Sequence, residues 1–179
     1  MSVQEIRNKV ILVDADDNVI GYAPKLEAHR KGMQHRAFSI VVFNSNGEIL
    51  LQQRASGKYH SAGLWSNTCC SHPQPGESIA TSAAARLQEE MGFSCELEYV
   101  GKFGYKAHLD NQLVENEIDH VFCGSYEGSV HPDSDEVAAF QWVAPDVLLK
   151  NIEENPERYT YWLGEVIRLS LESRFAQNF

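Results

Sequence analysis

Short apolar runs separated by turn residues divide much of the chain into strands. Residues 9–14 (KVILVD) and 18–22 (NVIGY) flank Ala-Asp-Asp, which predicts a first hairpin. Residues 37–43 (AFSIVVF) and 48–54 (EILLQQR) flank Asn-Ser-Asn-Gly, which predicts a second hairpin. Further strands are predicted at residues 64–70 (LWSNTCC), 95–103 (CELEYVGKF), 114–124 (VENEIDHVFCG) and 137–143 (VAAFQWV).

Helix signals occur between these strands. Residues 24–31 predict a short helix that ends at Gly32. Ser78 as N-cap, an Ala-rich body and Gly92 as C-terminal stop predict a longer helix. Asn155, followed by Pro and Glu, predicts the start of a final helix. Strands mixed with a few helices, without a repeat or a dividing linker, predict one α/β layered domain.

The composition is that of an ordinary globular protein, with 179 residues of which 43% are hydrophobic and 22% charged. A chain of this length is expected to bury roughly 70% of the surface that its unfolded form exposes, which is enough for one substantial core. The net charge of −10 comes without a basic stripe and argues against nucleic acid as the main partner. A small anionic substrate in a locally basic pocket remains compatible with this charge.

The sequence favours a cytoplasmic location. No apolar run approaches the roughly 18 residues that a membrane span needs, and the N-terminus lacks the apolar stretch of a signal peptide. The cysteines at positions 69, 70, 95 and 123 are too sparse for a disulfide scaffold. Free thiols are the better interpretation, and they fit a reducing compartment.

Two short motifs carry candidate chemistry. Cys70 and His72 stand two residues apart at a strand end, either as a buried thiol and a structural histidine or as a proton-transfer group and a ligand. Glu115 and Glu117 share one face of a predicted strand, and Asp119 continues that face. These carboxylates form either an exposed acidic face or a site in which a cation relieves their repulsion.

Other polar residues extend these motifs. His29 and His35, taken with His72, Glu115 and Glu117, would give a mixed nitrogen and carboxylate set suited to a divalent metal, although the sequence does not show that they converge. Arg86 and Glu90 are four residues apart on a helix, where they form either a plain ion pair or an anion contact and a metal ligand. Surface solubility and anion binding are both open for Lys25, Arg54 and Lys58.

Taken together, these pieces resemble the type 1 isopentenyl diphosphate isomerases, a branch of the Nudix superfamily. The matching segments, in family order, are EAHRKGMQHRAFS, ILLQQRASGKY, LWSNTCCSHPQPGES, RLQEEMG, LVENEIDHVF and ERYTYWL. The combination of Cys-Ser-His-Pro with Glu-Asn-Glu makes the resemblance specific. It implies a Nudix-type α/β/α layered fold with a mixed β-sheet, as a single domain over residues 1–179 with its core at about residues 9–165.

The chain departs from the sequence box of ordinary Nudix hydrolases, G-x5-E-x7-R-E-U-x-E-E-x-G-U with U apolar. It keeps Glu77, but it has Ser71 in place of the first Gly, Ala85 in place of the Arg and Arg86 in place of the following Glu. The lost Glu is a carboxylate that hydrolases use in metal binding. This departure argues against a diphosphate hydrolase, which stays as an alternative together with a catalytically silent metal-binding module.

The resemblance also implies roles for individual residues. Catalytic groups are matched by Cys70, Glu117 and Tyr105, and Trp162 matches a second aromatic group at the hydrocarbon end of the substrate. The ligands of a tightly bound Mn²⁺, Mg²⁺ or Zn²⁺ are matched by His29, His35, His72, Glu115 and Glu117. The site of a Mg²⁺ that arrives with the substrate is matched by Glu90 and the backbone carbonyl of Cys70. The diphosphate contacts are matched by Lys25, Arg54, Lys58 and Arg86.

The implied reaction interconverts isopentenyl diphosphate and dimethylallyl diphosphate through a tertiary carbocation. One proton adds to the terminal alkene and another leaves the neighbouring CH₂, so two proton-transfer groups must face a flat carbon unit from which water is excluded. Which of Cys70 and Glu117 gives the first proton stays open, with a preference for metal-bound Glu117 acting with Tyr105. The expected partner is this small-molecule substrate alone, with neither nucleic acid nor membrane, for a monomer or a homodimer.

Overall fold

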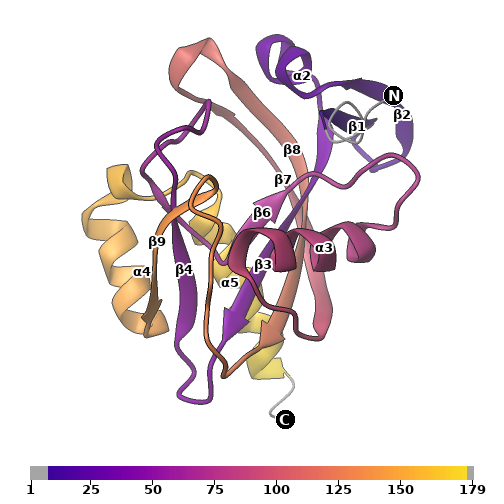
Figure 1. Cartoon of the computed structure of the whole chain (residues 1–179). Helices are drawn as coiled ribbons and strands as arrows, with labels where there is room; N and C mark the ends of the chain where they lie inside the picture. The colour runs from indigo at the N-terminus through magenta and orange to yellow at the C-terminus, as the bar shows by residue number, and fades with distance from the viewer. Residues whose placement is uncertain (1–7, 177–179) are drawn as a thin grey trace.

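The computed structural model describes residues 8–176, which form a mixed β-sheet between helices (Figure 1). The strands are β1 (Lys9–Val13), β2 (Val19–Pro24), β3 (His35–Phe43), β4 (Ile49–Arg54), β5 (Trp65–Ser66), β6 (Cys69–Ser71), β7 (Leu97–His108), β8 (Val114–Ser125) and β9 (Val137–Val143). The helices are α2 (Lys25–Lys31), α3 (Ile79–Met91), α4 (Pro145–Glu154) and α5 (Leu163–Ala176), with short 3-10 turns η1 (Asp110–Gln112) and η2 (Pro156–Arg158).

Strand β3 is central to the sheet and makes both kinds of strand pairing. One edge of β3 pairs in parallel with β8, from His35 opposite Glu117 to Phe43 opposite Ser125. Strand β8 in turn pairs antiparallel with β7. The other edge of β3 pairs antiparallel with β1, β6 and β4 in succession. The predicted mixed sheet is therefore confirmed, and so is the first hairpin, since β1 pairs antiparallel with β2.

Helices α3 and α5 cover opposite faces of this sheet (Figure 1). Phe38 and Ile40 of β3 pack in one core cluster with Leu87 of α3. Val41, which points the other way, packs in a second cluster with Ile167 of α5. Both faces of β3 are buried, which explains why its apolar run is continuous rather than alternating. The predicted α/β/α layering is confirmed.

The second predicted hairpin is confirmed, because β3 and β4 pair antiparallel across its turn, but the pairing is short. The turn closes with a hydrogen bond in which the Gly47 N–H donates to the Asn44 carbonyl at 3.0 Å. The two strands then pair at a single position, Phe43 opposite Ile49. Strand β4 continues instead between β9 on one edge and β5 on the other. Strands β3 and β4 therefore diverge and leave an opening between them.

Residues 65–71 fill this opening. Strand β5 pairs with β4 and β6 pairs with β3, so the single strand predicted at residues 64–70 is two short strands. Between them, Thr68 Oγ1 accepts a hydrogen bond from the Val42 N–H at 2.9 Å and donates one to the Leu50 carbonyl at 2.7 Å. One side chain thus satisfies two backbone groups that the diverging strands can no longer pair with each other.

The helix predicted after Ser78 is confirmed at both ends. The Ser78 side chain accepts a hydrogen bond from the Thr81 N–H at 3.1 Å and caps α3. Gly92 ends the helix in the left-handed conformation with φ of 76°. A Cβ at this position would lie 2.1 Å from the carbonyl oxygen of His131, so the close approach admits only glycine. The short helix before Gly32 is also confirmed, as α2.

The final helix does not begin at Asn155. The turn η2 ends at Arg158 because Tyr159 is extended, with φ of −122° and ψ of 152°, and forms a parallel bridge with Trp65. The following residue, Thr160, donates its N–H to the Trp65 carbonyl at 2.9 Å. Helix α5 starts only at residue 163, and the preceding helix α4, with a proline in its first turn, was not predicted. Tertiary pairing with β5 here overrides a local helix signal.

Two further expectations concern membranes and thiols. No helix in the described part of the chain is long and apolar enough to cross a membrane. The cysteines at positions 69, 70, 95 and 123 are all free thiols, as predicted.

The bridging role of Thr68 can be tested by substitution. Thr68→Val keeps the shape of the side chain but leaves a buried N–H and a buried carbonyl without partners, so the free energy of unfolding should fall by roughly 2–4 kcal/mol. Thr68→Ser keeps the hydroxyl and should lose only about 1 kcal/mol for the missing methyl group. Urea denaturation measures both variants, and equal losses would contradict the hydrogen-bonding role.

Candidate active site and metal centre

The candidate site lies on one face of the sheet, where alternate positions of β6, β3 and β8 point the same way. Ser39 of β3 lies opposite Cys70 of β6, and His35 lies opposite Glu117 of β8. Val41, two residues beyond Ser39, packs in the same cluster as α5. These strand side chains therefore share the sheet face that α5 covers, and the strand register decides which of them meet.

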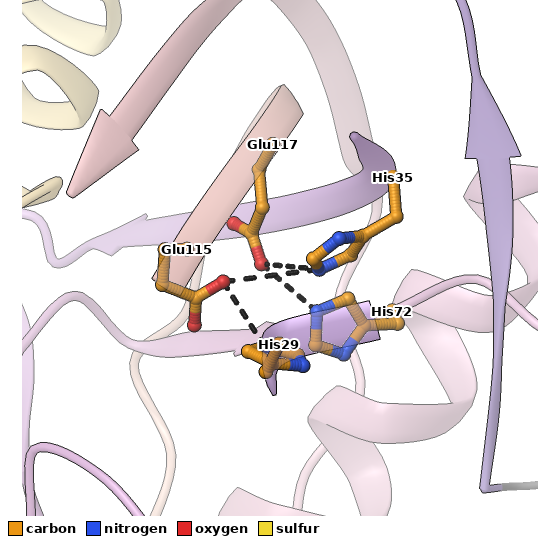
Figure 2. A group of neighbouring side chains, drawn as sticks. All are labelled: His29, His35, His72, Glu115 and Glu117. Atoms are coloured by element: carbon orange, nitrogen blue, oxygen red, sulfur yellow. Dashed lines mark hydrogen bonds and ion pairs between the residues drawn. The ribbon is translucent and has the colours of Figure 1, made fainter. Parts of the chain in front are cut away.

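Five side chains converge into a buried cluster of metal-ligand type (Figure 2). They are His29 from α2, His35 from β3, His72 from the loop after β6, and Glu115 and Glu117 from β8. One nitrogen or oxygen atom from each lies within 4.8 Å of the others. His29 Nε2 is 3.1 Å from Glu115 Oε2, while Glu117 Oε1 is 2.9 Å from His72 Nε2 and 3.3 Å from His35 Nε2.

Backbone carbonyls orient two of these imidazole rings. His29 Nδ1 lies 2.6 Å from the carbonyl oxygen of Lys25, and His35 Nδ1 lies 2.8 Å from that of Met33. A carbonyl oxygen only accepts, so the proton of each neutral ring resides on Nδ1 and the lone pair on Nε2 points into the cluster. Such carbonyl contacts commonly fix the tautomer of metal-binding histidines. Gly32, with φ of 62°, turns the chain between α2 and β3 so that both histidines face the same point.

The cluster fits a divalent cation. Among the described residues, His35 Nε2 and Glu115 Oε2 are buried polar atoms without a hydrogen-bond partner, and both point into the cluster. Burial, followed by the charge of Glu117, raises the pKa of Glu115. Burial would also raise the pKa of Glu117, but its close contacts with the His35 and His72 imidazoles hold it well below its usual range. A divalent cation would satisfy the orphaned atoms and offset the repulsion between the carboxylates.

A cavity of about 720 Å³ adjoins the cluster and collects most of the remaining candidate residues. Its lining includes Lys25, Arg54, Lys58, Cys70, Arg86, Glu90 and Trp162, together with His72, Glu115 and Glu117. These basic residues are therefore not scattered over the surface. They surround one hollow, where burial and the charge of Lys58 lower the pKa of Lys25 to about 8.

Carboxylates hold two of these cations in place. The Arg86 guanidinium bonds Glu89 at 2.7 Å and Glu90 at 2.5 Å, and it lies 3.4 Å from Glu136, which also pairs with Lys58. The predicted ion pair within α3 is thus present, and both of its members also face the cavity. Glu90 Oε2 accepts a further hydrogen bond from the Gln52 side chain of β4 at 3.1 Å.

The two candidate proton-transfer groups differ in their surroundings. Burial is the main factor that raises the pKa of Cys70 to about 11, so this group is a thiol at neutral pH, with Arg54 Nη1 3.9 Å from its Sγ. The hydroxyl of Tyr105 donates to Glu117 Oε2 at 2.7 Å. Glu117, which accepts this hydrogen bond, lines the cavity, whereas Tyr105 is not among the lining residues.

Trp162 closes the site from the α5 side. Its side chain is buried, with 4% exposed, and the indole N–H donates to Asn67 Oδ1 at 3.2 Å. The ring centroid lies 6.2 Å from that of Tyr105. The two aromatic residues named from the sequence therefore meet beside Glu117, although they lie more than fifty residues apart along the chain.

Sequence reasoning missed two side chains at the cluster, the buried His60 and the half-buried Tyr59. His60 Nε2 lies 3.1 Å from Glu115 Oε1, and the hydroxyl of Tyr59 lies 3.4 Å from His29 Nε2. Both residues belong to the loop between β4 and β5, which has no periodicity that would indicate burial. Asp119, noted as an extension of the acidic face, is buried and accepts a hydrogen bond from Ser39 at 2.8 Å.

Comparison with known proteins defines the class first. Residues 33–163 match the NUDIX domain. The fold resembles the crystal structure of a Deinococcus radiodurans protein with a TM-score of 0.73, at 17% identity over 89% of this chain and 97% of that one. It also resembles a MutT protein from Methanosarcina mazei with a TM-score of 0.65, at 20% identity over 78% of this chain and 94% of that one. The fold is thus that of a Nudix-domain protein.

Curated relatives narrow the class to one family. The chain is 51% identical to isopentenyl-diphosphate Delta-isomerase 1 of Aromatoleum aromaticum, over 90% of this chain and 92% of that protein. It is 49% identical to the isopentenyl-diphosphate Delta-isomerase of Burkholderia multivorans, over 88% and 89%. It is 40% identical to that of Photobacterium profundum, over 96% and 99%. The chain belongs to the isopentenyl-diphosphate Delta-isomerase family, which confirms the resemblance drawn from its motifs.

The candidate metal centre can be tested directly. If Glu115 is a ligand, Glu115→Gln removes its charge while preserving its shape, so the variant should retain less metal after dialysis against a chelator, with little change in urea denaturation. Glu153→Gln, on the exposed surface of α4, is the matched control and should retain as much metal as the unsubstituted chain. Elemental analysis measures the metal content, and equal retention in both variants would count against the site.

Proposed function

We propose that this chain interconverts isopentenyl diphosphate and dimethylallyl diphosphate, the activity of the family to which it belongs. The observation that carries the proposal is that a thiol and a carboxylate line the same cavity as four basic side chains. The basic groups suit a diphosphate, and the thiol and carboxylate suit proton transfer to and from carbon. Isomerisation needs the diphosphate-binding groups and the proton-transfer groups in the same cavity.

The basic side chains would anchor the substrate. In this proposal Lys25, Arg54, Lys58 and Arg86 contact the diphosphate. A Mg²⁺ arriving with the diphosphate would be held by Glu90 and the backbone carbonyl of Cys70, and would neutralise part of the phosphate charge. Binding of the diphosphate would leave the P–O bond intact and would hold the alkene in position next to the proton-transfer groups.

Cys70 and Glu117 would move the protons. They project from β6 and β8, which flank the central strand β3, so they approach the cavity from different strands. In one direction a proton adds to the terminal alkene carbon and another leaves the neighbouring CH₂, and the roles of the two groups exchange in the reverse direction. The Tyr105 hydroxyl holds Glu117 in place, and burial keeps Cys70 protonated before substrate arrives.

The buried ligand set would hold a tightly bound divalent metal, which would supply positive charge beside Glu117 and set its acidity. Mn²⁺, Mg²⁺ and Zn²⁺ are all compatible with three imidazoles and two carboxylates. Trp162 would face the carbocation, and a desolvated aromatic face stabilises positive charge by about 2 kcal/mol. Its bond to Asn67 fixes the ring for this role.

A Nudix-type diphosphate hydrolase is the weaker alternative. Arg86 stands where hydrolases carry a glutamate, and here it pairs with Glu90 rather than adding a carboxylate to the site. Cys70 and Glu117, which hydrolysis would leave unused, both line the cavity.

The free thiols also support a cytoplasmic location. The proposed partner is the small-molecule substrate alone, and the protein is proposed to be a monomer or a homodimer.

Proton NMR of isopentenyl diphosphate in D₂O with Mg²⁺ tests the activity directly. Dimethylallyl diphosphate with deuterium in a methyl group should appear, and the Cys70→Ala variant should lose at least about 10³-fold in rate with its metal content unchanged. Cys95→Ala is the matched control, because Cys95 does not line the cavity, and it should stay active. Unchanged substrate together with phosphate release from nucleoside diphosphates would favour the hydrolase.

The lowered pKa of Lys25 yields a pH prediction. Its ammonium is charged below a pH of about 8 and neutral above, and the diphosphate binds the charged form. The kcat/KM of the unsubstituted chain should therefore fall as the pH rises through about 8, with kcat changing less. Lys25→Arg stays charged, so its profile should remain flat through this range. The same alkaline limb in both proteins would remove Lys25 from substrate binding.

A further inference from the structure

We propose that His60 is a positioning residue that holds Glu115 in its metal-binding orientation and ties this carboxylate to the loop that carries Lys58. The inference deepens the proposed function, since it rests on the metal centre of that same site. It concerns a side chain outside the five-residue ligand set.

The two oxygens of Glu115 have separate contacts. Oε2 faces the cluster, at 3.1 Å from His29 Nε2 and 3.8 Å from His35 Nε2. Oε1 lies 3.1 Å from His60 Nε2. Oε2 is therefore available for a metal, while Oε1 is held by His60. A carboxylate secured in this way cannot rotate without breaking the His60 contact.

The surroundings of His60 define which nitrogen carries the proton. A carboxylate oxygen accepts, so Nε2 donates to Glu115, and Nδ1, 3.2 Å from Ser61 Oγ, accepts from that hydroxyl. His60 is only 4% exposed. Its ring stacks on His29 with centroids 5.5 Å apart, and the Tyr59 ring meets it edge-on at 4.6 Å. The ring is thus fixed in both position and tautomer.

Hydrogen bonds anchor the loop that carries His60. Arg54 Nη2 donates to the His60 carbonyl at 3.2 Å. The Ser61 N–H donates to Asp110 Oδ1 at 3.2 Å, and Ser61 adopts φ of 52°, a left-handed conformation that a side chain adopts only when its surroundings impose it. The Asn111 side chain donates to the Tyr59 carbonyl at 3.1 Å. The loop is therefore pinned both to β4 and to the turn that precedes β8.

The loop that carries His60 connects the cavity with the candidate metal cluster. Lys58, which lines the cavity, lies two residues before His60 on the same anchored loop. Asp110 and Asn111 lie shortly before Glu115 on the chain that leads into β8. The loop thus brings a cation to the cavity and a hydrogen-bond donor to a metal ligand. Supporting groups of this kind typically change metal affinity by about 10–100-fold when removed.

The test compares two substitutions of His60 in the full chain. His60→Gln keeps an N–H donor at a similar position, whereas His60→Leu keeps the volume and removes the donor. The dissociation constants of Mn²⁺ and of Zn²⁺ are measured by competition with a chromophoric chelator. His60→Leu should weaken metal binding by about 10–100-fold, and His60→Gln by no more than about 3-fold. His108→Leu, at an exposed histidine, is the matched control and should bind as the unsubstituted chain does.

A purely structural role would give a different result. It would lower the free energy of unfolding of the metal-free protein in both His60 variants and leave the metal affinity of the folded protein unchanged, and that outcome overturns the proposal. Equal loss of affinity in both variants, or a chain that binds neither ion, also overturns it. If His60→Leu fails to fold, Ser61→Ala serves, because it removes the hydroxyl that fixes the tautomer and should weaken binding several-fold; unchanged affinity there overturns the proposal.

The metal measurement is independent of turnover. A chain that binds metal in a His60-dependent way but does not isomerise isopentenyl diphosphate would overturn the proposed function and leave the role of His60 standing. A chain that isomerises the substrate but whose metal affinity does not depend on His60 would overturn the role of His60 and leave the proposed function standing.

Discussion

The burial of two carboxylates side by side on β8 is the constraint on which the rest of the site depends. Glu115 and Glu117 are both nearly inaccessible to water, and like charges so placed are tolerated only with compensating partners. The parallel register of β3 and β8 sets His35 opposite Glu117, and the turn at Gly32 returns α2 so that His29 reaches Glu115. The local topology thus supplies the histidines that the carboxylates require.

The divergence of β3 and β4 provides the space for the chemistry. A regular hairpin would have closed the sheet at this point, whereas the opening admits β5 and β6 and brings Cys70 beside the central strand. Thr68 stabilises the opening by satisfying one backbone group from each of the separated strands. The same opening lets Arg54 at the end of β4 approach the Cys70 thiol. An irregularity in the sheet therefore brings Arg54, proposed to bind the diphosphate, close to Cys70, proposed to transfer a proton.

Much of this could be predicted from the sequence where the signal was local. The period of two placed Glu115 and Glu117 on one face, and the caps at Ser78 and Gly92 delimited α3 correctly. Contacts between residues that are distant in sequence could not be predicted. The helix expected after Asn155 was wrong because Tyr159 pairs with a distant strand. His60 was missed because the sequence around a loop residue has no periodic pattern that would indicate burial. The convergence of the histidines was expected only from the family resemblance. The curated relatives confirm that resemblance.

The buried environment of Cys70 also has a consequence for chemical durability. Only the thiolate of a cysteine reacts readily with peroxides and alkylating agents. With a pKa of about 11, roughly one Cys70 side chain in ten thousand is a thiolate at pH 7. A group exposed to solvent at its ordinary acidity would be ionised far more often. Desolvation thus keeps the sulfur of this candidate catalytic residue in a form that peroxides and alkylating agents attack slowly.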